Sequence, residues 1–315
     1  MATPSILITG GSGHLGRWVE HLARTASACP EPVEWDIAAT YLNHPVHDPR
    51  VNWRRLDVAD RDAVDLLFRD IRPEVVIHTA ALNPGQGTAF DIVNAVGTCH
   101  VARAAARVGA RLVHVSTDVV FDGEKGNYVE EDPPSAITPY GRSKALAEEE
   151  VRASGARAVI VRTSLIYGPA VSCDSIPLGD TPWQHWDRQT RWVVGDLKAG
   201  KPVRLFADEL RCPVWVASLA APLLELAQSD QSQRIPTGTL HIAGSQCLSR
   251  YQFGLRLARF HGADPKGIAP TLSRDSGLIR PLDCTLDCSR ARALLQTPLP
   301  GVDQVLTHLR RARPS

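Results

Sequence analysis

Residues 5–26 read SILITGGSGHLGRWVEHLARTA, and this stretch decides the fold. The apolar run at its start predicts a buried strand, and the glycine-rich residues 9–16 predict a tight turn. Behind the turn, the spacing of Trp18, Leu22 and Ala26 predicts a helix. A strand, a tight turn and a helix in this order are typical of the first unit of a dinucleotide-binding domain.

Two glycine spacings overlap in the turn. Gly11, Gly13 and Gly16 satisfy GxGxxG, and Gly10, Gly13 and Gly16 satisfy the wider GxxGxxG. Without side chains, the backbone N–H groups can approach a pyrophosphate, whose charge the N-terminus of the following helix favours. A purely structural turn is the alternative, but the position between strand and helix favours cofactor binding. We therefore predict that the cofactor phosphates contact Gly10, Gly13, His14, Leu15 and Gly16.

Strands and helices alternate through the rest of the chain. Alternation at this length implies right-handed crossovers and a parallel sheet covered on both faces. We therefore predict an α/β fold, a Rossmann-type doubly wound parallel sheet. The expected strands are 36–42, 73–82, 111–121, 157–168, 202–206 and 238–244, and the expected helices are 61–71, 92–108, the one starting near Tyr140, and 213–227.

The chain is expected to form two interleaved domains. Because regularity weakens after Gly168, residues 1–168 are predicted to form the NAD(P)-binding domain, with 211–244 returning to it. The substrate-binding domain is smaller and comprises 169–210 and 245–315.

The composition predicts a folded protein with no general attraction for polyanions. The 315 residues are 43% hydrophobic, and 35 basic side chains balance 34 acidic ones, for a net charge of +1. No apolar run approaches the roughly 20 residues that cross a bilayer, and no export pattern opens the chain. We expect a cytoplasmic protein without a nucleic-acid or membrane partner. The seven cysteines are scattered, which argues against a disulfide framework and a metal site.

A phenol and an ammonium lie four residues apart in YGRSK at 140–144. ITP before this motif and ALAEEEVRA after it predict a helix, so Tyr140 and Lys144 share one face. Carbonyl reduction needs a proton donor at the oxygen, and a phenol with a pKa near about 10 is a poor one unless a cation lowers that pKa. Lys144 can supply the cation and can hold the cofactor ribose. The alternative is a surface Tyr and Lys on an amphipathic helix.

Ser116, Thr117 and Asp118 follow the apolar strand residues LVHV. They therefore lie at the carboxyl end of a strand, where open parallel sheets place their sites. Thr117 could donate a hydrogen bond to a substrate carbonyl, although turn residues would be expected at a strand end in any case. The joint occurrence of the glycine turn, Thr117, Tyr140 and Lys144 in this order favours a redox site.

The choice between NAD and NADP depends on the end of the second strand. An acid about 20 residues after the glycine turn would bind the NAD ribose, but residues 40–44 hold no acid and Asp36 comes too early. Arg17 could meet a 2′-phosphate instead, so we favour NADP(H) and leave NAD(H) open. Asp57, next to Val58 in RLDVAD, is expected to contact the adenine, to cap the following helix, or both.

The chain resembles the extended short-chain dehydrogenase/reductase superfamily along nearly its whole length. The resemblance is carried by TGGSGHLG, LDVAD, HTAA, NAVGT, VSTDVVFDG, YGRSKALAE and RTSLIYG. Within the superfamily, STDVVFDG, the acidic residues after Tyr128 and PYGRSKALAE are similar to the dTDP-4-dehydrorhamnose reductase branch. Asp118 supports that branch, because sugar-nucleotide epimerases usually have Ser or Thr there.

The resemblance implies a reaction and a set of residue roles. It implies NAD(P)H-dependent reduction of a carbonyl, the 4-keto group of a nucleotide-activated deoxysugar, with Thr117, Tyr140 and Lys144 as the catalytic residues. A homodimer is a further implication, because helices beside the tyrosine often pair in this superfamily. Three more positions match contacts that bind the cofactor or shape the site: Ala80, Ala81 and Asn94.

Two other functions stay open. The same branch resembles the regulatory beta subunit of methionine adenosyltransferase, a non-catalytic protein with a dinucleotide site; the three retained reacting residues favour the enzyme. Epimerase or dehydratase chemistry needs an additional acid or base near the sugar, and Asp118 is the candidate beside Thr117. The segment 171–192 lies where the substrate should be chosen, and its tryptophans either stack on a ring or pack a lid: Trp183, Trp186 and Trp192.

Overall fold

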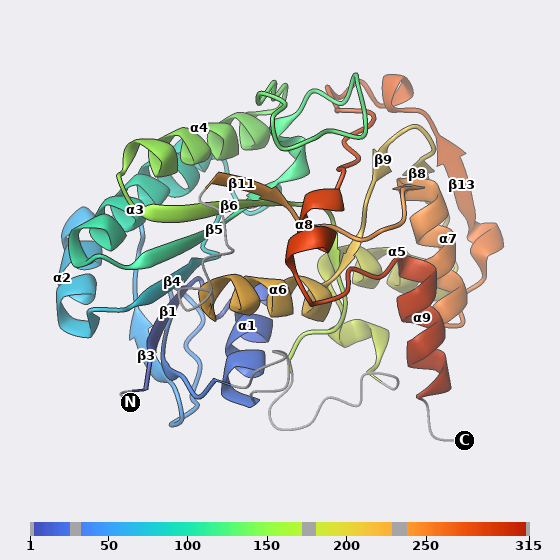
Figure 1. Ribbon diagram of the computed structural model, residues 1–315. Coiled ribbons are helices and arrows are strands. Elements are labelled where there is room, and N and C mark those ends of the chain that lie inside the picture. Colours follow the sequence, from blue (N-terminus) through green and yellow to red (C-terminus); the bar gives the residue numbers. More distant parts are fainter. Residues whose placement is uncertain (1–2, 26–32, 172–180, 229–237, 313–315) are drawn as a thin grey trace.

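The centre of the computed structural model is a seven-stranded sheet in the order β11-β6-β5-β4-β1-β2-β3 (Figure 1). The structure describes residues 3–25, 33–171, 181–228 and 238–312. All neighbouring strands of this sheet are parallel. The strands are β1 (Ser5–Thr9), β2 (Asp36–Tyr41), β3 (Asn52–Arg55), β4 (Val75–His78), β5 (Arg111–Thr117), β6 (Arg157–Thr163) and β11 (Gly238–His241).

Helices cover both faces of the sheet (Figure 1). Successive residues of β1 point to opposite sides, so Leu7 packs with α2 and α3 while Ile6 and Ile8 pack with α1 and α6. The central strands, such as β1 and β4, are buried on both faces and are nearly continuous apolar runs. One face carries α2 (Arg61–Ile71), the π-helix η1 (Asp91–Val96), α3 (Gly97–Val108) and α4 (Pro139–Ala153), and the other carries α1 (His14–Thr25) and α6 (Val216–Gln228).

The C-terminal part of the chain forms a smaller unit beside the carboxyl edge of the sheet (Figure 1). Two hydrophobic clusters hold it together, one around Trp186, Trp215 and Phe253 and one around Val194 and Leu205. Its helices are α5 (Arg188–Lys198), α7 (Arg250–Phe260) and α9 (Val302–Arg311), whereas α8 (Ser289–Leu294) contacts β11 and packs in the core of the large sheet. Its short strand pairs are β7 (Ile166–Tyr167) with β10 (Val214–Trp215), β8 (Val203–Phe206) with β13 (Ile268–Thr271), and β9 (Leu210–Arg211) with β12 (Leu248–Ser249).

The predicted α/β fold with a doubly wound parallel sheet is confirmed. The late strand expected at 238–244 does return to the sheet, where β11 pairs with β6. Strand β3 was not predicted, because NWRR has no apolar alternation. It lies at the edge of the sheet, where three of its residues are exposed. No helix within the described ranges has both the length and the apolar character needed to cross a bilayer.

Candidate active site

The glycine turn packs tightly against its neighbours. Gly10 has a φ of +74°, and its N–H donates to Thr40 Oγ1 at 3.0 Å. The N–H of Gly13 donates to the carbonyl of Gly10 at 2.9 Å. A Cβ at Gly10 would lie 2.6 Å from Ala80 Cα, and one at Gly16 would lie 2.3 Å from the Gly10 carbonyl oxygen. Side chains are therefore excluded at both positions, because neighbouring backbone fills the space that a Cβ would need.

The start of α1 has the donors that a pyrophosphate needs. Because α1 begins at His14, the N–H groups of its first turn have no carbonyl acceptor earlier in the same helix. The first turn contains no acidic residue that would repel a phosphate. Burial lowers the pKa of His14, with Asp187 opposing that shift and Arg191 adding to it. The predicted phosphate contacts at His14, Leu15 and Gly16 thus lie where a dinucleotide fits the fold.

Arg17 already has a carboxylate partner. Its Nη1 lies 2.7 Å from Oε2 of Glu20, which is fully buried, and its guanidinium carbon lies 5.5 Å from the centre of the Trp53 ring. A 2′-phosphate at this position would have to share the guanidinium with Glu20.

Asp57 does not cap α2. The N-cap is Asp60, whose Oδ1 accepts from the N–H of Ala63 at 3.0 Å, so the cap interpretation of Asp57 is wrong. Asp57 is exposed after β3, and Val58 is buried against Gly97, where a Cβ would come within 2.7 Å of the valine. The adenine contact stays a prediction for Asp57.

Helix α4 positions the predicted proton donor. Thr138 caps the helix by accepting the N–H of Gly141 at 3.1 Å, and Pro139 occupies its first turn, where a missing N–H costs nothing. The fixed N-terminus places Tyr140 and Lys144 one turn apart, as the spacing predicts.

Lys144 is almost fully buried, with 2% of its surface exposed. Its Nζ donates to the carbonyl oxygen of Val115 in β5 at 2.7 Å. Because an ammonium has three donors, two remain for a ribose. Burial lowers the pKa of Lys144 to about 8, and Glu148 opposes that shift.

Tyr140 retains its proton at neutral pH in this structure. Burial raises the pKa of Tyr140, the Asp118 carboxylate raises it further, and a hydrogen bond from Thr117 opposes both. This direction is opposite to the lowering expected from Lys144, because burial and the Asp118 carboxylate outweigh the effects that lower the pKa. The phenol Oη donates to Asn83 Oδ1 at 3.3 Å.

Asp118 is enclosed by partners at the end of β5. Its Oδ1 accepts from Thr117 Oγ1 at 3.1 Å, and its Oδ2 accepts from Ser164 Oγ at 2.6 Å and lies 3.7 Å from Arg211 Nε. Burial raises the pKa of Asp118, against the opposing effect of Arg211. With both oxygens engaged, Asp118 holds Thr117 in place and is poorly placed to act on a sugar.

Asn94 joins α4 to the loop after β4. It is fully buried in the π-helix η1, a kind of distortion that is frequent at functional sites. Its Nδ2 donates to Leu82 O and to Ser143 Oγ, each at 3.0 Å, and its Oδ1 accepts from the N–H of Leu82 at 2.8 Å. Ser143 Oγ in turn donates to the carbonyl of Tyr140 at 2.8 Å.

The structure brings most of the predicted residues to the carboxyl edge of the sheet. Thr117, Tyr140, Lys144 and Asn94 lie around the end of β5, and Ala80 touches the glycine turn, with Ala81 next to it after β4. Four further residues contact this group and were not predicted as site residues: Asn83, Ser143, Ser164 and Arg211. Two of them lie in motifs that carry the family resemblance, Ser143 in YGRSKALAE and Ser164 in RTSLIYG, whereas Asn83 and Arg211 lie outside those motifs.

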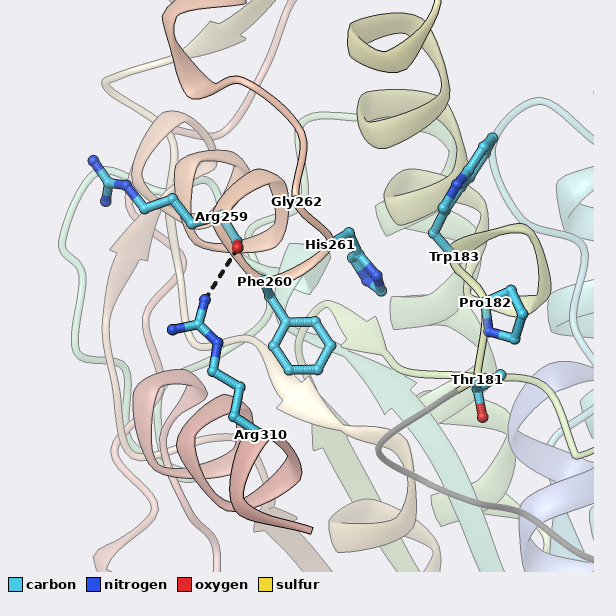
Figure 2. A pocket seen from close by; sticks show the side chains of 8 residues that line it. All are labelled: Thr181, Pro182, Trp183, Arg259, Phe260, His261, Gly262 and Arg310. Carbon is cyan, nitrogen blue, oxygen red and sulfur yellow. Dashed lines mark hydrogen bonds between the residues drawn. The ribbon is translucent and has the colours of Figure 1, made fainter. Parts of the chain in front are cut away.

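A hollow of about 670 Å³ lies apart from these residues, within the C-terminal part (Figure 2). It lies between Trp183 and Arg259, and Arg310 crosses it to donate to the Arg259 carbonyl at 3.1 Å. Trp186 is buried against Trp215, so this tryptophan packs within the protein. Residues 172–180 of the tryptophan-containing segment lie outside the described residues.

The sequence matches the family described as RmlD substrate binding domain over residues 4–311. The chain belongs to this family. A dTDP-4-dehydrorhamnose reductase of Mycobacterium tuberculosis is 34% identical over 281 residues, which are 85% of this chain and 79% of that protein. The methionine adenosyltransferase 2 subunit beta of Rattus norvegicus is 26% identical over 297 residues, 92% of this chain and 82% of that one.

The fold is also that of a solved family member. The crystal structure of dTDP-4-dehydrorhamnose reductase from Bacillus anthracis in complex with NADP superposes with a TM-score of 0.76 and 23% identity, covering 98% of this chain and 99% of the other. Family membership confirms the resemblance predicted from the sequence and, with it, the predicted class of NAD(P)-dependent oxidoreductase.

Proposed function

We propose that the chain reduces the 4-keto group of a nucleotide-activated deoxysugar, with NADP(H) as the favoured cofactor and NAD(H) as the alternative. The observation that carries the proposal is the grouping of Tyr140, Thr117 and Lys144 at the carboxyl edge of the sheet, where Lys144 is bonded to Val115 of β5. The 34% identical M. tuberculosis reductase supports the substrate class, and the NADP complex of the B. anthracis protein supports the cofactor.

Each reacting residue has one task in this proposal. The bound cofactor supplies the hydride that the carbonyl carbon accepts. Tyr140 gives its phenol proton to the carbonyl oxygen, and the Thr117 hydroxyl turns from Asp118 to donate its one hydrogen bond to the same oxygen. Lys144, anchored on Val115, offers its remaining donors to the cofactor ribose. The glycine turn and the start of α1 bind the phosphates, with Asp57 beside the adenine and Ala80 and Ala81 at the strand end.

A second candidate is a regulatory subunit without turnover. A methionine adenosyltransferase beta subunit is 26% identical over 92% of the chain, and this similarity favours a regulatory subunit. An epimerase is less well supported, because both oxygens of Asp118 are engaged by protein groups.

Reduced-nicotinamide absorbance should be followed with NADPH or NADH and a panel of 4-keto-6-deoxy sugar nucleotides. We expect turnover with the wild-type protein and a loss of about 10²- to 10⁴-fold in Tyr140→Phe, because the variant keeps the ring and loses the proton. NADPH affinity, measured by fluorescence titration, should stay within a few-fold of wild type. Tight cofactor binding with no turnover on any compound would reject the reductase, and a coprecipitating partner would then favour the regulatory subunit.

A further inference from the structure

The loop after β4 reaches the proton donor through Asn83. The phenol Oη of Tyr140 donates to Asn83 Oδ1 at 3.3 Å. The backbone of Asn83 is fixed by Gln86, whose Oε1 accepts the N–H of Asn83 at 2.8 Å and whose own N–H donates to the Asn83 carbonyl at 3.0 Å. The backbone from which the exposed side chain of Asn83 reaches Tyr140 is thereby fixed.

The residue before Asn83 is anchored as well. Asn94 bonds both the N–H and the carbonyl of Leu82, and it also donates to Ser143 Oγ. Ser143 donates to the carbonyl of Tyr140. The hydrogen bonds therefore form a closed path. It runs from the backbone of Tyr140 through Ser143 and Asn94 to the loop, and from Asn83 back to the phenol of Tyr140.

The other side of the loop is held by α5, in the C-terminal part. Arg188, the first residue of α5, donates from Nη1 to the carbonyl of Pro84 at 2.9 Å. Gly85 follows with a φ of +82°, and a Cβ there would lie 2.6 Å from the same nitrogen. The positive φ favours glycine at this position, and the absence of a side chain leaves room for the guanidinium beside it.

We propose that Asn83 is a positioning residue for Tyr140 and that Arg188 holds it there, which couples α5 to the orientation of the proton donor. The inference rests on the proposed reductase. An amide oxygen accepts hydrogen bonds and donates none, so Asn83 holds the phenol oxygen in place and protonated until the substrate carbonyl replaces Asn83 as the acceptor. Loss of that acceptor leaves the phenol ring packed against Phe90 but its O–H bond free to rotate.

Kinetics separate positioning from substrate binding. Asn83→Ala and Arg188→Ala should each lower kcat about fivefold, which is the effect of losing one hydrogen bond. Each should change KM by less than about twofold. Asn83→Asp keeps an acceptor oxygen in the same place and should stay closer to wild type than Asn83→Ala. Lys198→Ala removes a cation from the other end of α5 and serves as the matched control. The double variant Asn83→Ala/Arg188→Ala should be no slower than the worse single variant.

A spectroscopic readout tests the hydrogen bond without turnover. Tyrosine labelled with carbon-13 at Cζ gives five signals, and Tyr140→Phe identifies the one from Tyr140. That signal should move in Asn83→Ala and in Arg188→Ala, and it should stay near its wild-type position in Lys198→Ala. An unmoved signal in Asn83→Ala would overturn the proposal. If the wild-type protein shows no turnover at all, the reductase assignment fails while the carbon-13 signals still decide the role of Asn83.

Discussion

At the scale of single residues, burial sets the two protonation states that the proposed reaction uses. It raises the pKa of Tyr140 and lowers that of Lys144 to about 8, because each side chain is more costly to bury in its charged form. The donor therefore keeps its proton at neutral pH, while the ammonium lies close to the point of losing its own. The raised pKa also makes the phenol a weaker acid, so it opposes the proton transfer for which a lowered pKa would be expected.

The pKa of Lys144 predicts a pH dependence of cofactor binding. Below about 8 the side chain carries a charge, and the charge is lost as pH rises through that value. NADPH affinity, measured by fluorescence titration, should fall by up to about tenfold between pH 7 and pH 9. Lys144→Met should bind more weakly at pH 7 and should lack this dependence. Equal pH dependence in both proteins would contradict a role for the ammonium.

At the scale of elements, the glycine turn and α1 follow directly from the sequence. Gly10 has a positive φ that favours glycine, and a side chain at Gly16 would collide with the carbonyl of Gly10. The glycines that the sequence motif contains are thus the ones that the turn requires. The helix predicted at 61–71 likewise matches α2, because an apolar stripe and an acidic N-cap mark it.

Gly16→Ala tests the turn as a phosphate site. The added Cβ would force the turn away from the Gly10 carbonyl, so NADPH affinity should fall about tenfold or more, about 1.4 kcal/mol. Gly109→Ala is the control, because this glycine has a φ of +75° and a Cβ there would meet nothing within 4 Å. It should lower the melting temperature and leave affinity unchanged. Equal losses of affinity in both variants would point to general destabilisation.

Features that depend on contacts between residues without a regular spacing in the chain could not be predicted from the sequence. β3 is a polar edge strand, and its pairing with β2 becomes visible only in the assembled sheet. Asn83 lies in an irregular loop, 57 residues from Tyr140 in the chain, so no local spacing connects them. The pKa of Tyr140 shifts upward and not downward as predicted, because burial and the Asp118 carboxylate act on the phenol, and neither could be read from the spacing of Tyr140 and Lys144.

At the scale of the whole molecule, Arg211 ties the two parts of the chain together at the site. It is 4% exposed, pairs with Asp118 at the end of β5, and donates to the carbonyls of Leu282 and Pro281 at 2.9 Å. A guanidinium can make all these contacts at once because its donors are fixed in one plane. The catalytic edge of the sheet is thus braced by segments far away in sequence.

Arg211→Met should lower the free energy of unfolding by about 3 to 5 kcal/mol, because Asp118 is left buried without its cation. Urea unfolding of the full chain measures this loss. The double variant Arg211→Met/Asp118→Asn should recover part of it, since no buried carboxylate remains. Strictly additive losses would show that the two side chains do not interact.

The sheet order has a consequence for synthesis on the ribosome. β6 ends at Thr163, but its outer partner β11 begins only at Gly238, and α6, which covers one face, begins at Val216. The nascent chain therefore carries an unpaired strand edge and a bare apolar face while the intervening segments are translated. Such edges pair readily with other chains. This interval is when the newly made protein depends most on chaperones.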